Sequence, residues 1–496
     1  YTPAGGSLRL WKKDGTENRL KAQPPAGDYV AGQVAYLPIQ LGAGHSFALY
    51  AEGIEAGSGE IRAELAPDGV NWACACSTRY SVVSLDLDMD SNNDDGFKEP
   101  ERSDYEDMIE HQAALTGKLV CVNSGDQDDD GVPNLADGFD LWGNEGDGAG
   151  GAFTPLVLER LGPIEVAVAR LRFEYEASDP GQVGRTGGGA PDDPYVHTPA
   201  DGSLRIWKRD GDQARKASEV NAGGDFVQGD AEYMVSELGT NRTINLYVEG
   251  LEPSVKWGDK PIAVWLDPDG DGPAPWMCRE RVCVTVLEAD VDVDTDNDNG
   301  WEAPERDARE DQYENISTNA GKLVEVNDGD INGDGIPNYA DGYDCPASGN
   351  PRHADAGGRF LPIELSVSEV VDPAVALIRI EYSASDPGAV TGWGTPRQYA
   401  PAPGLLRVWS VDGMEARERS QYVEPGIYEL SRFGLARTLY VEGVRPGEAT
   451  LTVSIDPDGA SSTNIGFLCT DVIKVTVLKI DLVTPAGDPV NAAVQS

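Results

Sequence analysis

Hydrophobic and polar residues alternate in short runs along most of this chain. The runs are rich in Val, Leu, Ile and Tyr, and they include residues 80–85, 282–287 and 473–478. Alternation with a period of two, interrupted by Gly and Pro, is typical of antiparallel strands that bury one face. Several such strands in each stretch of roughly one hundred residues predict β-sandwich units.

A dispersed motif occurs three times and predicts three related units. Each copy opens with Leu-Arg-x-Trp, continues with Leu-Tyr-x-Glu-Gly and then has a Pro-Asp-Gly turn. Because an aromatic residue inside an alternating strand usually packs in the core, we expect the Trp and Tyr residues of the motif to be buried. These residues are Trp11, Trp207 and Trp409, and Tyr50, Tyr247 and Tyr440.

An opening pattern precedes the motif in the second and third units and is missing before the first. It begins with Phe-Thr-Pro-Leu-Val-Leu at Phe153 and with Phe-Leu-Pro-Ile-Glu-Leu at Phe360, and a second strand pattern follows each. A sandwich that lacks strands exposes apolar surface and strand edges. We therefore expect that the parent chain continues upstream or that another molecule supplies the missing strand, with residues 481–496 of a neighbouring subunit as the candidate donor.

Residues 84–140 align without a gap on residues 288–344, and this duplicated stretch is strongly acidic. Its second loop, at 126–137 and again at 330–341, carries oxygen side chains at loop positions 1, 3, 5, 9 and 12 and glycine at position 6. Calcium takes about six to eight oxygen ligands, and a twelve-residue loop supplies them by turning sharply at a glycine. The spacing therefore predicts two calcium-binding loops.

A first loop begins in each acidic segment where a strand is expected to end. Alternate residues of an extended strand face the same side, so the carboxylates here should converge. Glutamate falls at position 12 counted from Asp90 or Asp294 and would close an EF-type loop, although glycine falls at position 7. The candidate ligands are Asp86, Asp88, Asp90, Asn92, Asp94 and Glu101, and in the second copy Asp290, Asp292, Asp294, Asp296, Asp298 and Glu305. Short helical turns are expected after each glutamate.

The run Asp-x-Asn-x-Asp-Gly-Ile-Pro-Asn-x-x-Asp at residues 330–341 resembles the calcium repeats of thrombospondin type 3 modules and, more loosely, dockerin loops. The resemblance implies that calcium is bound by Asp126, Asp128, Asp130 and Asp137, and by Asp330, Asn332, Asp334 and Asp341. Thrombospondin arrays place many repeats back to back, whereas each loop pair here lies between expected sandwiches. The whole chain is similar to large secreted bacterial surface proteins with tandem immunoglobulin-like domains.

These patterns together predict a mainly β chain of tandem immunoglobulin-like β-sandwiches joined by calcium-binding loop modules with short helical turns. The expected order is an incomplete sandwich at 1–85, a calcium module at 86–145, a sandwich at 152–288, a calcium module at 289–346, a sandwich at 358–482 and a tail at 483–496. Each acidic module follows the last strand of one unit, and none follows the final unit. We therefore expect the modules to be metal-set joints that fix the angle between sandwiches.

Composition narrows the partners of the chain. A formal net charge of −46 over 496 residues would repel nucleic acid phosphates and anionic lipids and favours cations. No run of about eighteen apolar residues is present, so no membrane insertion is expected. Because residue 1 is Tyr, we expect a mature or processed product.

Cysteine and histidine usage gives little sign of catalytic chemistry. Seven cysteines without a CxxC pair argue against zinc ribbons and thioredoxin-like motifs, while disulfides stay open. Cys76, Cys278 and Cys469 each lie six residues before a Val in a late strand, which suggests a structural role. The four histidines form no H-E-x-x-H arrangement, and nucleophile elbows, P-loops and dinucleotide fingerprints are missing. We therefore expect no enzymatic activity.

These features favour an extracellular, calcium-stabilised structural protein that forms part of a filament, stalk or surface layer. Its expected partners are further copies, joined head to tail by strand donation, or other surface proteins. Two other functions stay open at this point: a calcium-dependent adhesin that binds a glycan or protein, and a spacer region of a larger secreted enzyme.

Overall fold

The computed structural model describes residues 7–17, 19–20, 27–42, 46–89, 119–123, 153–177, 183–185, 195–197, 202–213, 215–270, 276–294, 322–328, 360–384, 390–391, 398–399, 404–413, 419–459 and 466–480. These residues confirm the mainly β class, with strands in several sheets and a few short helices. Among them, no helix is long and apolar enough to cross a lipid bilayer.

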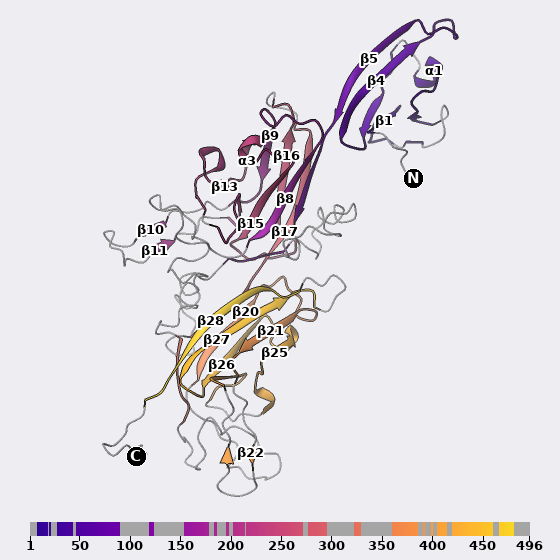
Figure 1. Cartoon of the computed structure of the whole chain (residues 1–496). Coiled ribbons are helices and arrows are strands. Elements are labelled where there is room, and N and C mark those ends of the chain that lie inside the picture. Colours follow the sequence, from indigo (N-terminus) through magenta and orange to yellow (C-terminus); the bar gives the residue numbers. More distant parts are fainter. Residues whose placement is uncertain are drawn as a thin grey trace.

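The first unit comprises β1 to β5 and lies at one end of the molecule (Figure 1). One sheet has the order β2-β1-β3, and β4 pairs with β5 in a separate hairpin. The Leu-Arg-x-Trp motif forms β1 and the Tyr-x-Glu-Gly motif forms β3, so that Trp11 pairs with Tyr50. The bounds are Leu8–Trp11 for β1, Tyr29–Val30 for β2, Tyr50–Gly53 for β3, Gly57–Leu65 for β4, Cys74–Val82 for β5 and Pro38–Leu41 for α1.

The second sandwich packs two five-stranded sheets around one hydrophobic core. The sheet orders are β13-β12-β15-β8-β6 and β14-β9-β16-β17-β7. The bounds in the first sheet are Ser84–Met89 (β6), Thr154–Leu161 (β8), Leu204–Trp207 (β12), Phe226–Val227 (β13) and Thr243–Gly250 (β15). Those in the second are Leu119–Cys121 (β7), Arg170–Glu174 (β9), Ala231–Met234 (β14), Lys260–Asp267 (β16) and Cys278–Leu287 (β17). Small elements are Val183–Arg185 (β10), Tyr195–His197 (β11), Val220–Ala222 (η1) and Val235–Leu238 (α3).

The third sandwich repeats this plan with sheet orders β18-β20-β26-β24 and β19-β28-β27-β21-β25. The bounds in the first sheet are Ala289–Val293 (β18), Leu361–Val367 (β20), Leu406–Trp409 (β24) and Ala436–Gly443 (β26). Those in the second are Leu323–Glu325 (β19), Leu377–Tyr382 (β21), Gly426–Glu429 (β25), Gly447–Asp456 (β27) and Leu468–Leu478 (β28). Small elements are Val390–Thr391 (β22), Gln398–Tyr399 (β23), Arg419–Gln421 (η4) and Leu430–Arg432 (η5).

The repeated aromatic residues are buried to different degrees. Burial confirms the prediction that the three repeated tryptophans are core residues. Tyr247 and Tyr440 are partly buried and pack against aromatic clusters. Tyr50 differs, because 39% of its surface is exposed, and the expectation that it packs inside is wrong.

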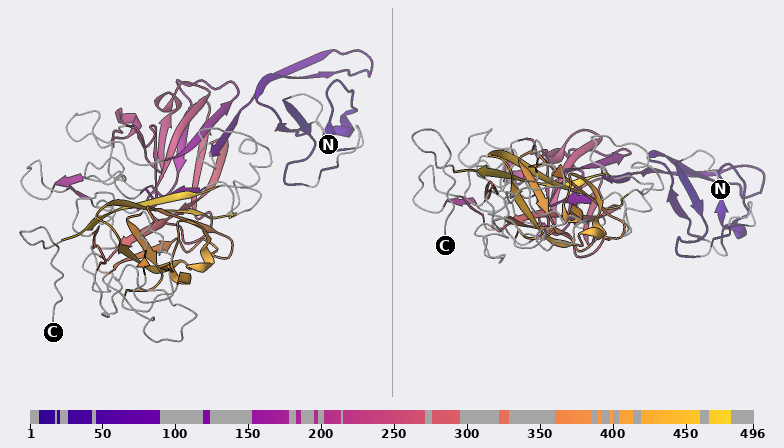
Figure 2. Two further views of the ribbon diagram at one scale, coloured as in Figure 1. Left: turned by 60° about the horizontal axis from the view of Figure 1, so that its bottom comes forward. Right: turned by 90° about the horizontal axis from the view of Figure 1, so that it is seen from below.

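Successive units are joined by continuous chain from one strand to the next. β5 ends at Val82 and β6 begins at Ser84, yet β5 belongs to the first unit and β6 pairs with β8 of the second sandwich. In the same way, β17 and β18 are separated by Glu288 alone, and β18 pairs with β20 of the third sandwich. Figure 2 shows the first unit joined to the second sandwich by the chain that runs from β5 into β6.

The expectation that the acidic segments form the joints between sandwiches is therefore wrong. The first acidic segment leaves from β6 and returns to β7, and both strands lie at edges of the second sandwich. The third sandwich holds β18 and β19 in the same way. Each acidic segment thus connects strands of one sandwich. Each joint is the single residue, Val83 or Glu288, that precedes β6 or β18.

A disulfide and apolar contacts reinforce the second joint. Cys121 of β7 bonds Cys469 of β28, which ties the second sandwich to the third. Leu287 and Trp257 of the second sandwich pack into the hydrophobic core of the third.

The strand register corrects one predicted equivalence among the cysteines. Leu65 pairs with Cys74 as Leu266 pairs with Cys278, so the counterpart of Cys278 in the first unit is Cys74 and not Cys76.

Candidate functional site

Two edge strands carry the described part of the predicted metal ligands. Leu85, Leu87 and Met89 of β6 point into the core of the second sandwich. Asp86 and Asp88 lie between them in the sequence, so their side chains share the opposite face. The predicted alternation of carboxylates along this strand is therefore confirmed.

The corresponding strand of the third sandwich has the same pattern. Val291 and Val293 of β18 are buried in the core, and Asp290 and Asp292 occupy the alternate positions. Asp294 follows the strand, and its backbone N–H donates to the Pro362 carbonyl oxygen over 3.2 Å. Both copies thus present two or three carboxylates on one face where the acidic loop begins.

These carboxylates become less exposed along each strand. Asp86 and Asp290 are half-buried, whereas Asp88 and Asp294 have no exposed surface and Asp292 has little. A carboxylate in such surroundings is stable only where a cation or hydrogen-bond donors lie close to it. These buried carboxylates are the last described acidic residues before each loop.

The chain returns from each first acidic loop through a short parallel strand. β7 pairs with β17 through Leu119 and Thr285, and β19 pairs with β28 through Leu323 and Thr476. Each returning strand is followed by a buried asparagine, Asn123 or Asn327. The described strands on either side of residues 90–118, β6 and β7, thus lie at the edges of the two facing sheets.

The side chain of each asparagine lies in a buried polar cluster that is formed by residues of the repeated motif. Asn123 Nδ2 donates to Glu249 Oε1 over 3.1 Å, and Trp207 Nε1 donates to Glu249 Oε2 over 2.8 Å. The Arg205 guanidinium lies 3.7 Å from the same carboxylate. The third sandwich repeats these contacts at 2.9, 2.8 and 3.7 Å with Asn327, Trp409, Arg407 and Glu442.

This cluster explains why Leu-Arg-x-Trp and Leu-Tyr-x-Glu-Gly recur together. The first motif forms β12 and the second ends β15, and the pairing of these strands puts Arg205 opposite Glu249. The acidic segment adds the asparagine, so that its return strand is bonded to the motif. The asparagine was missed as a structural residue, although the alignment of the duplicated stretch, with an offset of 204 positions, pairs Asn123 with Asn327.

Fifteen of the predicted ligands lie outside the described residues. They are Asp90, Asn92, Asp94, Glu101, Asp126, Asp128, Asp130, Asp137, Asp296, Asp298, Glu305, Asp330, Asn332, Asp334 and Asp341. The expected helical turns at 101–115 and 305–320 also lie outside them. Within the part of the chain that is described, no group of three or more His, Cys, Asp or Glu side chains is placed to hold a metal ion.

Comparisons with known proteins give the chain no family. No protein-family model matches it. No curated protein sequence matches it either. Its function must therefore be inferred from the strands, the buried clusters and the acidic loops themselves.

Proposed function

We propose that this chain is an extracellular, calcium-stabilised structural protein of tandem immunoglobulin-like sandwiches, which serves in a filament, stalk or surface layer. The observation that carries the proposal is the continuity of strands from unit to unit. One residue, Val83 or Glu288, separates the last strand of one unit from the first strand of the next. So short a connection leaves little freedom between neighbouring units, as a stiff structural element requires.

Contacts at the second joint support a set orientation. The Glu288 backbone N–H donates to Ser368 Oγ over 2.6 Å, and the Ser368 N–H donates to the Glu288 carbonyl oxygen over 3.1 Å. Together with the disulfide between Cys121 and Cys469, these bonds hold the two sandwiches on either side of the joint. Disulfides persist in oxidising compartments, which supports an extracellular location.

The described donor residues fit calcium. Carboxylate oxygens are the ligands that this hard cation prefers. Asp86 and Asp88 would contribute to the first loop of the second sandwich, and Asp290, Asp292 and Asp294 to that of the third. The ions would neutralise closely spaced carboxylates and so stabilise the long connections between edge strands. The thrombospondin type 3-like spacing of the second loops supports the same proposal.

Removal of calcium should lower the thermal stability of the full chain. Ions that bind the native state alone stabilise it, by about 2.7 kcal/mol for each site at a hundredfold excess over Kd. The measurement is calorimetric unfolding of the 496-residue chain in calcium and in excess EGTA. We expect the transitions of the second and third sandwiches to move to lower temperature in EGTA.

Paired variants separate loop binding from general charge effects. Asp330→Asn combined with Asp334→Asn should reduce the response to calcium, whereas Glu252→Gln, at an exposed position outside the loops, should leave it unchanged. Magnesium at equal concentration should not replace calcium, because it demands a smaller octahedral site. Equal melting temperatures in calcium and EGTA would refute calcium stabilisation.

A further inference from the structure

The first unit has strand edges at the places where the complete sandwiches hold two further strands. β15 of the second sandwich lies between β12 and β8, and β16 lies between β9 and β17. The counterparts of β15 and β16 in the first unit are β3 and β4. Among the described residues, β3 pairs with β1 alone and β4 pairs with β5 alone. The described part of the first unit therefore contains no strands of the β8 and β9 types.

Apolar side chains along these edges are exposed. Leu65 and Leu266 occupy the same position, two residues before the Pro-Asp-Gly turn. Leu266 is opposite Leu171 of β9 and is fully buried, whereas half of the Leu65 surface is exposed. Tyr50 of β3 is the counterpart of Tyr247, which faces Pro155 of β8. The two complete sandwiches thus show which strands would cover the open edges.

An arginine in the first unit is placed to receive an aromatic ring. In the second sandwich the Arg215 guanidinium lies 4.3 Å from the Phe153 ring centre and 5.1 Å from that of Trp207. Arg19 has the same spacing from Trp11 in the sequence and lies 4.8 Å from its ring centre. The Arg19 side chain keeps 20% of its surface exposed, whereas Arg215 is 2% exposed. The Phe153 ring lies against the Arg215 guanidinium in the second sandwich and accounts for part of this difference in exposure.

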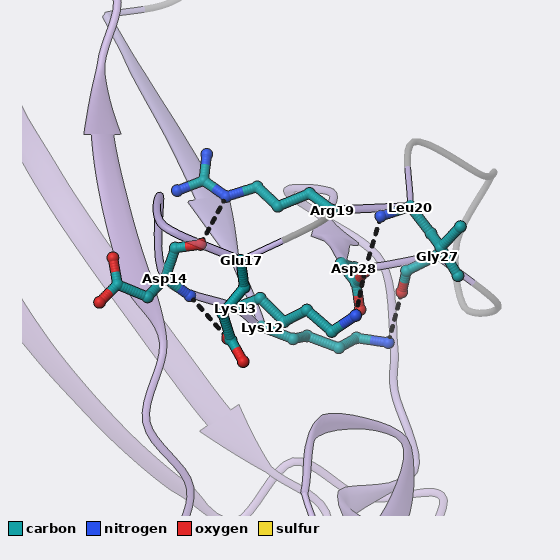
Figure 3. Close-up of polar contacts among 8 residues, drawn as sticks. All are labelled: Lys12, Lys13, Asp14, Glu17, Arg19, Leu20, Gly27 and Asp28. Atoms are coloured by element: carbon teal, nitrogen blue, oxygen red, sulfur yellow. Dashed lines mark hydrogen bonds and ion pairs between the residues drawn. The ribbon is translucent and has the colours of Figure 1, made fainter.

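The described residues next to Arg19 repeat one backbone contact of the complete sandwich. The Leu20 N–H donates to Asp28 Oδ2 over 2.7 Å, as the Lys216 N–H donates to Asp225 over 2.9 Å. Lys13 pairs with Asp28 at 3.2 Å, and the Arg19 Nε donates to the Asp14 carbonyl oxygen over 3.2 Å (Figure 3). These contacts hold the described residues around Arg19 and Asp28 together.

We propose that the first unit accepts a two-strand polypeptide segment of the same repeat type as residues 153–177. Its first strand, with the pattern Phe-x-Pro-(Leu/Ile)-x-Leu, hydrogen-bonds antiparallel along β3, and its phenylalanine stacks on Arg19 beside Trp11. Its second strand, with the pattern (Leu/Ile)-Arg-x-Glu-Tyr, pairs with β4 and covers Leu65. This is strand addition to an open sheet edge, with side-chain pockets that give specificity.

The two copies of this segment within residues 1–496 already form strands of the second and third sandwiches. Leu156 and Leu158 of β8 and Ile363 of β20 are buried in their own sandwiches. A second copy of residues 1–496 could donate them only by opening a finished core. The occupant is therefore a further repeat segment from outside these residues. The inference rests on the proposed structural role, since it names how one unit receives the next polypeptide.

The direct test uses a labelled synthetic peptide with the sequence of residues 153–177, added to the full chain in calcium. Fluorescence anisotropy should show saturable binding, and hydrogen exchange should slow at the amides of β3 and β4. Peptide Leu156→Asp with Leu171→Asp is the matched control and should bind at least tenfold more weakly, because it places carboxylates against the apolar face.

Variants of the protein locate the site. Leu65→Asp should weaken peptide binding at least tenfold, and it should leave the fold intact because Leu65 is already exposed. Val255→Asp, at another exposed apolar position in the second sandwich, should leave binding unchanged. Peptide Phe153→Ala should also weaken binding. That loss should shrink when the protein carries Arg19→Ala, because both changes remove one stacking contact.

Other results would overturn the assignment. No binding to the intact chain, or equal binding by the control peptide, would exclude an acceptor edge. Binding that appears only after deletion of residues 481–496 would show that the tail of a copy fills the edge. Because binding is measured with calcium present, its failure alongside a normal EGTA response would contradict strand acceptance alone and leave the proposed structural role standing.

Discussion

At the scale of single residues, the buried carboxylates of Glu249 and Glu442 organise each complete sandwich. Each accepts hydrogen bonds from a tryptophan and an asparagine and pairs with an arginine. These donors come from the repeated motif and from the end of the acidic connection. One carboxylate therefore fixes both the sheet and the point to which the acidic loop returns.

Glu249→Gln should destabilise the second sandwich by about 3–5 kcal/mol, because it leaves the buried Arg205 charge without the carboxylate that balances it. Denaturant unfolding of the full chain, followed by tryptophan fluorescence, measures the loss. The matched control is Glu52→Gln in the first unit, where Glu52 also contacts the motif tryptophan and arginine but is about one-third exposed. Solvent screens its ion pairs, so the loss of stability is expected to be smaller than for Glu249→Gln. Equal effects of the two variants would contradict the special role of Glu249.

Residue burial was predictable wherever it depends on local pattern. The Trp of Leu-Arg-x-Trp lies in an alternating strand, and its burial followed from that alternation. Tyr50 was mispredicted, because burial at its position requires a β8-type strand that is not part of the described first unit. The partners of Glu249 were not predictable from spacing, because Asn123 is 126 positions away in sequence.

At the scale of elements, the two joints are built differently. The second has a disulfide and shared apolar packing. At the first, a cleft of about 690 Å³ lies between the first unit and the second sandwich, with Ile54, Glu55, Ser84 and Arg160 in its wall. Gly162 follows β8 at this joint with φ of +107°, and a Cβ there would lie 2.7 Å from the Val82 carbonyl oxygen.

Gly162→Ala should therefore disturb the first joint. The strained backbone and the clash with Val82 should together cost about 1–3 kcal/mol of stability. Gly426→Ala is the control, because a Cβ at Gly426 meets no atom within 4 Å. Thermal unfolding and small-angle scattering of both variants measure stability and the angle at the joint. A Gly162→Ala protein with unchanged melting and scattering would refute a close joint.

The strands themselves were predictable from alternation, but their sheets were not. Alternation predicts strands at residues 84–89 and 289–293, because it shows that one face of each is buried. It does not predict which strand each one pairs with. Their pairing with β8 and β20 depends on contacts far along the chain. The acidic segments were for that reason expected to be joints, when they connect two edges of one sandwich. Most of their predicted ligands stay predictions.

At the scale of the whole molecule, the disulfide between Cys121 and Cys469 joins positions 348 residues apart. In the chain-entropy picture, a loop of this size stabilises the native state by about 6 kcal/mol. Changing both cysteines to serine should lower the unfolding temperature of the third sandwich and loosen its contact with the second. Cys74→Ser, at an exposed free thiol, is the control and should have no effect. Calorimetry in the absence of reductant distinguishes the two variants.

The same covalent link decides how the molecule would carry a pulling force applied at its two ends. Tension that reaches Cys121 would cross the sulfur–sulfur bond directly to Cys469 of β28. The chain between them, with a contour length on the order of 1,200 Å, would stay slack while that bond holds. Three of the four acidic loops and most strands of the second and third sandwiches fall within this unloaded span, whereas β28 beyond Cys469 lies outside it. The oxidised molecule could then lengthen through the residues before Cys121 and after Cys469, and reduction would release the span between them as well.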